Sequence, residues 1–396
     1  MLACGQQHAA HLATELRFSD EALAGIAELD GMRDDFVNWL AGFQFTGDIV
    51  ALPEGTPVFP DEPILEVTAP IAEAQLLETL LMNTVHLETV LASRAARFVL
   101  AADGRPVVDF GMRRMHGTDA AVQGVRAFRT AGIAATSHVL AGLHYGLPVR
   151  GTMAHSFIQA HDDETDAFRR YVELYPGTTL LVDTYDTLAG IDKVIALRDE
   201  MGEAFSIGAI RLDSGDLATL AHAARERLDG AGLDDVQIFA SGGLDEERID
   251  ALVRGGAPID AFGVGTQLGT AADAPSVDLA YKLTEYDGKP RLKTSPGKAI
   301  WPGRKQVYRM RDAHGGTHHD ELVSRDETRD GEALLEPVVT CGDVIHTKTC
   351  DLEAARNHAG EEIGRLPAHL REITPGEAPF ELRVADSLRK LRAAAE

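Results

Sequence analysis

The feature that most constrains the fold is an alternation of short apolar runs and helical segments between Val107 and Val264. An apolar run followed by a helical segment is typical of a βα unit, in which crossover helices join parallel strands. A series of this length favours a barrel or near-barrel over an open doubly wound sheet. The candidate strands are Val107–Phe110, Ala134–Ser137, Pro148–Met153, Thr179–Val182, Ser206–Leu212, Val236–Ala240 and Ala261–Val264.

The residues on either side of this series follow a different pattern. A long helical segment at Ile71–Ala102 follows short runs bounded by Pro and Gly, and the alternation stops after about Pro275. We therefore expect an α/β fold, with an irregular, TIM-like α/β barrel at residues 107–275 and a second α/β domain formed from residues 1–106 and 276–396. In this second domain the sequence further predicts a helix at Ser19–Phe43 and strands at Asp48–Leu52, Pro63–Val67, Leu279–Leu283, Arg291–Thr294 and Gln306–Arg311.

Composition limits the class of function. The 396 residues carry a formal net charge of −24, which argues against nucleic acid or an anionic membrane surface as a partner. Cys4, Cys341 and Cys350 are widely spaced and form no zinc pattern, which suits a reducing cytoplasm. We interpret Cys341 and Cys350 as ordinary thiols. The sequence contains no export signal and no apolar run of about 18 residues, so we expect a cytoplasmic protein.

Polar and glycine residues follow most of the candidate strands at their C-terminal ends, where α/β barrels place their chemistry. Each residue alone has a structural explanation, because an aspartate can cap the next helix and a glycine can permit a tight turn. His155, within Gly151–Phe157, is by itself equally compatible with a turn histidine and a catalytic one. The joint position of these strand-end residues at one rim of the barrel predicts a functional site. Its residues are Arg113, Arg114, Thr152, His155, Asp183, Arg211, Asp213, Ser241, Gly242, Gly243, Gly265 and Thr266.

These residue types fit a phosphorylated sugar. Two glycine-rich turns, each opening a helix, offer backbone N–H groups to a phosphate. The pair Arg113 and Arg114 supplies bidentate donors for a second phosphate or a pyrophosphate. Asp213 suits ribose hydroxyls or the charge that develops at an anomeric carbon. A sugar with a phosphate at one end and a pyrophosphate at the other would fit this set.

The residues at the strand ends lie in six motifs, which are DFGMRRMHG (109–117), GTMAHSF (151–157), LLVDTYDT (180–187), IRLDSGDL (210–217), FASGGLDE (239–246) and FGVGTQLGT (262–270). These motifs resemble the nicotinate phosphoribosyltransferase family, in the order and with the spacing of its compact bacterial form. The resemblance runs from about Leu16 to the C-terminal tail. It implies a type II phosphoribosyltransferase fold, a homodimer with shared sites, and ATP-coupled condensation of nicotinate with phosphoribosyl pyrophosphate in NAD salvage, with Mg²⁺ accompanying the phosphates.

The resemblance also implies a role for each matching residue, and none of them is a metal ligand. His155 resembles the histidine that ATP phosphorylates, and Asp183 resembles the carboxylate that orients its imidazole. Thr152 and Arg211 resemble the nicotinate contacts, and Asp213 resembles a ribose ligand that steadies positive charge at the anomeric carbon. The remaining matches are the 5′-phosphate turns, Ser241, Gly242, Gly243, Gly265 and Thr266, and the pyrophosphate-binding pair, Arg113 and Arg114.

The N-terminal segment departs from the family pattern. Family members begin with Thr-Asp-x-Tyr-x-Leu-Thr-Met, whose tyrosine packs on nicotinate, and nothing before Leu16 matches this motif or the hairpin after it. We therefore expect a truncated gene model or a shifted reading frame, which would leave the base pocket without one wall. Two alternatives remain open, a nicotinamide phosphoribosyltransferase of the same fold and a catalytically impaired homologue. A quinolinate phosphoribosyltransferase is disfavoured, because two carboxylates require several basic side chains.

Overall fold

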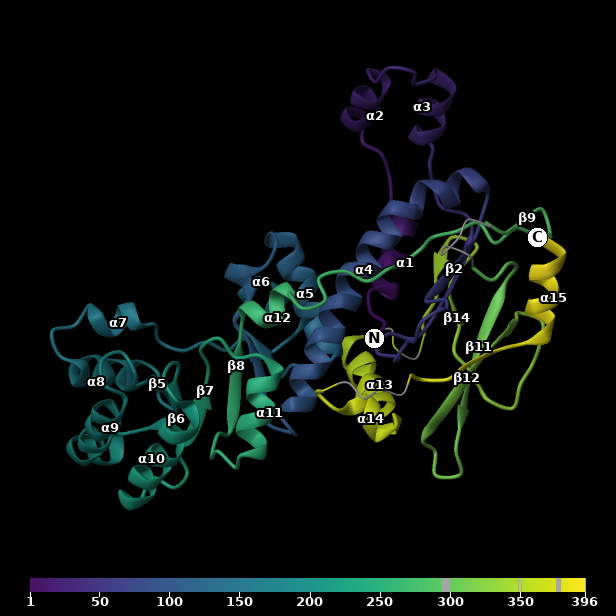
Figure 1. Cartoon of the computed structure of the whole chain (residues 1–396). Coiled ribbons are helices and arrows are strands. Elements are labelled where there is room, and N and C mark those ends of the chain that lie inside the picture. Colours follow the sequence, from purple (N-terminus) through teal and green to yellow (C-terminus); the bar gives the residue numbers. More distant parts are fainter. Residues whose placement is uncertain (294–299, 348, 350, 375–378, 396) are drawn as a thin grey trace. The chain divides into compact units, whose positions relative to one another are not determined.

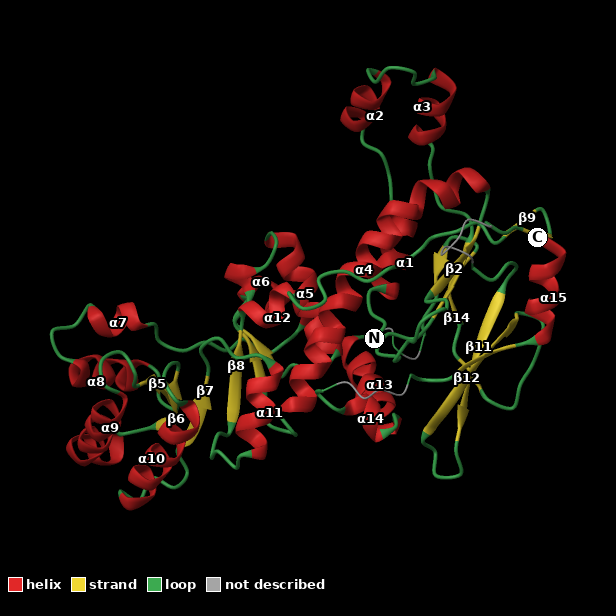
Figure 2. Ribbon diagram, viewed as in Figure 1, coloured by secondary structure: helices red, strands yellow, loops and turns green. Residues whose placement is uncertain are grey.

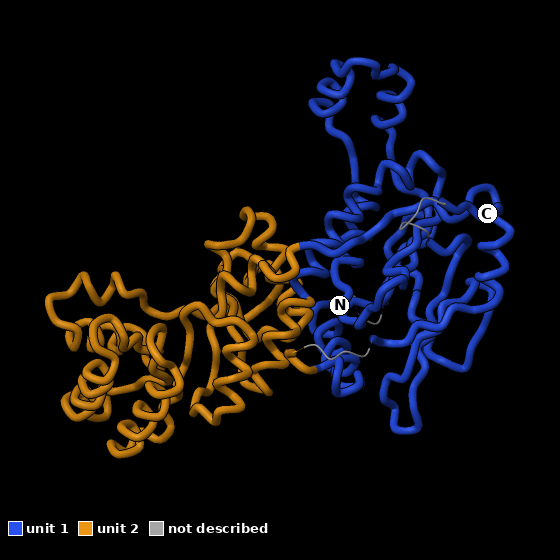
Figure 3. The backbone as a smooth tube through the Cα atoms, in the orientation of Figure 1, with its two compact units in different colours: residues 1–92, 276–371, 376–396 blue, residues 93–275, 372–375 orange. Residues whose placement is uncertain are grey.

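The computed structural model describes residues 1–293, 300–347, 349, 351–374 and 379–395. The chain forms two compact units, which Figure 3 colours separately. Unit 1 contains residues 1–92, 276–371 and 376–396, and unit 2 contains residues 93–275 and 372–375. The sequence places the first boundary at residues 106–107, whereas the units divide at residues 92–93, within the long helix α4 (Ile71–Ala101).

Unit 2 is an α/β half-barrel built on one six-stranded sheet (Figures 1 and 2). The strand order is β4-β3-β8-β7-β6-β5, and every neighbouring pair is parallel, so the predicted α/β fold with a parallel sheet is confirmed. Parallel neighbours place their C-terminal ends at one edge of the sheet. The strands are β3 (Val107–Asp109), β4 (Ala135–Thr136), β5 (Thr178–Leu181), β6 (Ile207–Leu212), β7 (Gln237–Ala240) and β8 (Ala261–Val264).

Crossover helices connect these strands, and their N-termini follow the strand ends that form the candidate site. Asp163, Asp186, Asp216 and Asp245 each cap a helix, because their side chains accept a hydrogen bond from a first-turn amide. The helices of unit 2 after α4 are α5 (Thr118–Thr130), α6 (Val139–Tyr145), α7 (His155–Gln159), α8 (Glu164–Leu174), α9 (Thr187–Met201), α10 (Leu217–Gly230), α11 (Glu246–Arg254) and α12 (Thr266–Thr270), with 3-10 turns η1 (Met112–Arg114) and η2 (Gly202–Ala204).

The predicted strand Pro148–Met153 is wrong. Only Val149 bridges to the sheet, through Thr136, where the N–H of Arg150 donates to the backbone oxygen of Thr136 at 2.9 Å. The residues from Gly151 to Ala154 then run outside the sheet to α7. The segment is held by a side chain instead, because the hydroxyl of Thr152 accepts a hydrogen bond from Arg211. A short apolar run therefore has the composition of a strand although most of its backbone forms no hydrogen bonds with the sheet.

Unit 1 contains two four-stranded sheets, ordered β15-β14-β1-β2 and β13-β11-β12-β16, and a small hairpin, β9–β10. Phe45, Ile49, Leu81 and Val307 belong to its buried core. The elements are α1 (Gln6–Glu15), α2 (Asp20–Ala27), α3 (Asp34–Ala41), β1 (Asp48–Ala51), β2 (Leu65–Thr68), β9 (Glu285–Tyr286), β10 (Lys289–Pro290), β11 (Lys305–Arg311), β12 (Thr317–Ser324), β13 (Glu332–Ala333), β14 (Glu336–Thr340), β15 (Asp343–Val344), α13 (Leu352–Arg365), α14 (Ala368–Arg371), β16 (Leu382–Val384) and α15 (Asp386–Ala395).

Several predictions for unit 1 need correction. The predicted helix Ser19–Phe43 is two helices, α2 and α3, separated by a turn in which Gly31 has a φ of 84°. Leu279–Leu283 and the described part of Arg291–Thr294 are not strands, and Thr294 lies outside the described residues. Cys350 also lies outside them, and Cys341 is exposed. None of the described helices has the length and hydropathy needed to cross a membrane.

Candidate active site

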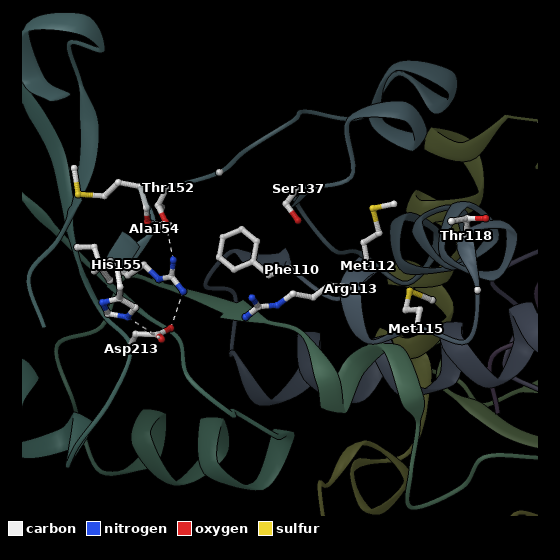
Figure 4. Close-up of a pocket in the computed structure, with 15 residues that line it drawn as sticks. Phe110, Met112, Arg113, Met115, Thr118, Ser137, Thr152, Ala154, His155 and Asp213 are labelled. Atoms are coloured by element: carbon white, nitrogen blue, oxygen red, sulfur yellow. Dashed lines mark hydrogen bonds and ion pairs between the residues drawn. The ribbon is translucent and has the colours of Figure 1, made fainter. Parts of the chain in front are cut away.

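A pocket of about 690 Å³ opens in unit 2 where the parallel strands end (Figure 4). Its lining comes from residues that end or follow neighbouring strands, including Phe110 after β3, Ser137 after β4, Leu181 in β5 and Asp213 after β6. Residues 151–155, which lead into α7, complete one side. In Figure 4, His155 and Asp213 lie on one side of Phe110, and Met112, Met115 and Thr118 lie on the other.

Arg211, near the end of β6, is the centre of a polar cluster in this pocket. Its Nη1 donates to the hydroxyl of Thr152 at 2.6 Å, and its Nε donates to the hydroxyl of Ser241 at 2.7 Å. Its Nη2 donates to Oδ1 of Asp213 at 2.6 Å, and its guanidinium carbon lies 5.3 Å from the ring centre of Phe110. These contacts use three of the five N–H donors of the guanidinium. An anionic ligand can take the donors that remain.

Asp213 is held as a carboxylate by the same cluster. Its Oδ1 also accepts a hydrogen bond from the hydroxyl of Ser241 at 2.6 Å. Burial opposes ionisation, but the hydrogen bond from Ser241 and the charge of Arg211 outweigh it, so the pKa of Asp213 lies below its ordinary value. Asp213 therefore carries a negative charge in the pocket at neutral pH.

His155 is the first residue of α7 and remains partly exposed, with 42% of its side chain accessible. Its Nδ1 lies 3.1 Å from the hydroxyl of Thr184. Its Nε2 lies 3.6 Å from Oδ2 of Asp213, a contact that Figure 4 marks with a dashed line. If Nδ1 carries the proton and donates it to Thr184, Nε2 keeps a lone pair that faces the pocket. The histidine can then act as a nucleophile.

In the described part of the chain, no hydrogen bond or ion pair joins Asp183 to His155, so the sequence-based prediction that Asp183 orients the imidazole is not supported. Its Oδ2 accepts hydrogen bonds from the backbone N–H of Asp213 at 3.1 Å and from the hydroxyl of Ser214 at 2.5 Å. Its side chain is buried and holds the turn after β6. Asp183 therefore acts on the geometry of Asp213, and the hydroxyl of Thr184 is the group that orients the imidazole.

In each of the two DxxD segments one aspartate caps a helix and the other does not. Asp186 caps α9 and Asp216 caps α10. Asp183 and Asp213 precede these caps by three positions and are not used as caps. The capping explanation that an isolated aspartate permits therefore applies to the second member of each segment and not to the first.

The turn Ser241–Gly243 packs directly against Asp213. Gly242 has a φ of 92°, and a Cβ placed on it would come within 1.6 Å of the backbone oxygen of Asp213. Within the described chain, no backbone acceptor is seen for the N–H groups of Gly242 and Gly243. The second turn, Gly265–Thr266, opens α12, and Gly265 packs against Phe110. Both turns thus present amides beside pocket residues, although neither lines the pocket itself.

We expect Gly242→Ala to lower the free energy of unfolding by about 2–5 kcal/mol, from left-handed strain plus a backbone clash. Gly243 is the matched control, because it also has a positive φ of 64°, but a Cβ placed on it would lie 3.9 Å from the nearest atom, on the side chain of Arg248. Gly243→Ala should cost only about 1–2 kcal/mol. Urea unfolding measures both values, and equal losses for the two variants would contradict the close approach at Gly242.

The arginine pair lies in η1, which follows β3 after Phe110 and Gly111. Arg113 lines the pocket and Arg114 does not, and both are exposed. The turn is anchored by Asp109, whose Oδ1 accepts from the N–H of Gly111 at 2.7 Å and whose Oδ2 accepts from the hydroxyl of Thr136 at 2.7 Å. Burial raises the pKa of Asp109. Asp109 therefore fixes the backbone from which the two arginines extend.

Two residues of the site are not predicted from the sequence. Phe110 completes an apolar run and is assigned there to a strand, but its ring faces Arg211 in the pocket. Thr184, next to Asp183, supplies the hydroxyl that contacts His155. The available signal is positional, since Phe110 directly follows β3 and Thr184 lies in the turn after β5, both at the rim.

A parallel half-barrel whose rim joins an arginine–aspartate cluster, a histidine and two glycine turns indicates an enzyme that acts on a phosphorylated small molecule. The NAPRTase N-terminal domain model matches residues 2–86, and the nicotinate phosphoribosyltransferase (NAPRTase) family model matches residues 106–312. The nicotinate phosphoribosyltransferase pncB2 of Mycobacterium tuberculosis is 50% identical over 388 residues, covering 98% of this chain and 84% of that protein. The chain belongs to the nicotinate phosphoribosyltransferase family.

Solved structures agree on the fold. Human nicotinic acid phosphoribosyltransferase matches with a TM-score of 0.86 at 24% identity, over 99% of this chain and 92% of that chain. The nicotinate-nucleotide pyrophosphorylase of Pyrococcus furiosus matches with a TM-score of 0.72 at 27% identity, over 92% and 85%. The N-terminal family match begins at residue 2, so the resemblance extends further than the start near Leu16 that the motifs indicated.

Proposed function

We propose that the protein transfers a phosphoribosyl group from phosphoribosyl pyrophosphate to nicotinate, forming nicotinate mononucleotide and pyrophosphate in NAD salvage. The observation that carries this proposal is the cluster around Arg211, which contacts Thr152, Asp213 and the ring of Phe110 in one pocket and Ser241 beside it. The cluster combines a cation and an aromatic face for an anionic ring with a carboxylate for a sugar. The name of the Mycobacterium tuberculosis relative supports the same substrate.

In this proposal the pyridine ring of nicotinate packs against Phe110. The carboxylate of nicotinate accepts hydrogen bonds from the remaining N–H donors of Arg211. The ribose hydroxyls bind Asp213. The 5′-phosphate binds the turns Ser241–Gly243 and Gly265–Thr266, and Arg113 and Arg114 bind the pyrophosphate. Thr152 holds Arg211 in its orientation.

The bond between the anomeric carbon and pyrophosphate breaks as the ring nitrogen of nicotinate forms the new bond to that carbon. Positive charge develops on the ribose in this step, and the negative charge of Asp213 stabilises it. Pyrophosphate leaves with the electron pair, and Arg113 offsets its charge. The lowered pKa of Asp213 keeps the carboxylate ionised for this role.

We also propose that ATP phosphorylates His155. The lone pair of Nε2 attacks the γ-phosphorus, the bond to ADP breaks, and water later cleaves the N–P bond to release phosphate. The contact of Nδ1 with Thr184 supports Nε2 as the attacking atom. Asp213, 3.6 Å from Nε2, would couple the histidine to the ribose site.

Mg²⁺ would enter with the phosphates of ATP and phosphoribosyl pyrophosphate. It takes carboxylate and phosphate oxygens as ligands, and Oδ2 of Asp213 is the carboxylate oxygen that suits it, because Oδ1 already accepts two hydrogen bonds. The ion supplies charge neutralisation of the phosphates. The buried side chain of Asp183 does not line the pocket and does not suit this role.

A homodimer in the cytoplasm is part of the proposal. The exposed side chains of Arg113 and Arg114 support a shared site, in which a second copy completes the pyrophosphate region. The widely spaced cysteines support a reducing compartment.

The substrate is tested by supplying nicotinate, nicotinamide or quinolinate to the purified protein with phosphoribosyl pyrophosphate and MgATP. We expect mononucleotide from nicotinate, with a preference over nicotinamide of about a hundredfold or more, because Arg211 pairs with a carboxylate and not with an amide. Chromatography of the products measures this ratio. Preferential use of nicotinamide would favour the amide-specific enzyme, and no turnover with any of the three would favour the impaired homologue.

A further inference from the structure

Arg94 is a buried cation of unit 2 that the proposed chemistry does not use. It lies in α4 with 6% of its side chain exposed, and its guanidinium carbon is 5.2 Å from the ring centre of Phe98. The same guanidinium reaches two other helices. Nε donates to the backbone oxygen of Gln267 in α12 at 3.2 Å, and Nη1 pairs with the carboxylate of Glu246 at the start of α11. Nη1 also pairs with Asp273, beyond the end of α12, at 2.9 Å.

The two glycine turns lead into these two helices. The chain passes from Ser241–Gly243 through the cap residue Asp245 into α11, and from Gly265 into α12. The contacts of Arg94 with these helices fall within their first residues, at Glu246 and Gln267. One side chain therefore connects the two segments that would provide amides to a single phosphate.

The ion pair with Glu246 is fully enclosed. Glu246 is 0% exposed, and its Oε1 is shared by Arg94 and by Nε of Arg97 at 2.8 Å. Its Oε2 has no hydrogen-bond partner among the described residues. A buried carboxylate is costly without a paired cation, so the position of α11 depends on these guanidiniums.

Arg97 differs from Arg94 in what else it contacts. Its Nη2 donates to the backbone oxygen of Ile373 at 2.8 Å, and its hydrogen bonds and ion pairs in the described chain reach no residue of α12. Arg97 thus shares the carboxylate of Glu246 without linking the two helices. The chain offers a control that matches Arg94 in charge, helix and ion-pair partner.

We infer that Arg94 is a positioning residue that sets the spacing of the turns Ser241–Gly243 and Gly265–Thr266, so that both bind the same 5′-phosphate. This inference rests on the proposed function, which places the phosphate at these turns. A site assembled from two separate segments binds well only when its donors are held within about 0.5 Å of the productive geometry. A misplacement of about 1 Å can cost a hundredfold in function.

The test compares nicotinate mononucleotide with nicotinate riboside, which differ only in the 5′-phosphate, by titration calorimetry on the wild type, Arg94→Lys and Arg97→Lys. Lysine keeps a charge against Glu246 but lacks the planar fork that reaches Gln267 as well. We expect Arg94→Lys to weaken mononucleotide binding by about tenfold to a hundredfold and to leave riboside binding within about twofold. Arg97→Lys should retain the wild-type ratio of the two affinities.

Two results would count against the inference. An unchanged ratio of the two affinities in Arg94→Lys, whether both fall equally or neither falls, would give Arg94 a merely structural role. Equal effects of Arg94→Lys and Arg97→Lys on the ratio would assign the effect to Glu246 alone. A wild type that binds both ligands equally would instead overturn the proposed phosphate site, and with it the basis of the inference.

Discussion

His155→Ala should abolish ATP-dependent phosphorylation of the protein and leave slow, uncoupled synthesis of nicotinate mononucleotide. The variant lacks the nitrogen that attacks the γ-phosphorus, so ATP hydrolysis should fall on the order of 10³-fold or more. Arg211 and Asp213 keep their mutual contact, and therefore the ribosyl-transfer site remains. Labelling with γ-labelled ATP, followed by acid and base treatment, measures the phosphoenzyme.

Thr184→Ala is the matched control for this experiment. It removes the hydroxyl that lies 3.1 Å from Nδ1 but leaves the imidazole in place. The variant should still form the acid-labile phosphoenzyme, at a rate lowered by about tenfold, because one orienting hydrogen bond is lost. Acid-labile phosphoenzyme in His155→Ala would show that another residue carries the phosphoryl group.

Arg211→Ala should raise the KM for nicotinate by about a hundredfold and the KM for phosphoribosyl pyrophosphate by less than about tenfold. The guanidinium is proposed to bind the carboxylate of nicotinate, whereas the ribosyl substrate keeps its turns and the arginine pair. A smaller effect on the second substrate is expected because Asp213 loses a hydrogen bond. Steady-state kinetics with each substrate varied in turn measures both values.

Arg211→Lys separates charge from geometry at this position. Lysine retains a positive charge but cannot contact Thr152, Ser241 and Asp213 as the planar guanidinium does. Its KM for nicotinate should lie between those of the wild type and Arg211→Ala. Equal increases for both substrates in Arg211→Ala would point to general disruption of the pocket.

The parallel sheet of unit 2 could be predicted because each strand is a short apolar run followed by a helical segment. The segment from Pro148 to Met153 has the same composition, but its backbone leaves the sheet after Arg150 and a hydrogen bond from Arg211 to Thr152 holds it. Composition does not distinguish a segment whose backbone is hydrogen-bonded to neighbouring strands from a segment that is held by a side-chain hydrogen bond. The sequence does not predict the break between α2 and α3, because apolar residues continue at helical spacing across Gly31.

The meeting of Thr152, Arg211 and Asp213 could be expected because strand ends of a parallel sheet share one edge. The partners of each side chain could not be predicted in the same way. Asp183 precedes Thr184 by one residue, and the backbone at this strand end aims the threonine, not the aspartate, at His155. Contacts at this level depend on side-chain direction, which strand position alone does not determine.

A crystal structure with nicotinate mononucleotide bound would test the proposed site as a whole. The expected structure has the pyridine ring against Phe110, its carboxylate on Arg211, the ribose at Asp213, and the phosphate on the amides of Gly242 and Gly243. A nucleotide bound outside this pocket, or bound with its phosphate at Arg211, would contradict the proposal that this pocket catalyses phosphoribosyl transfer to nicotinate.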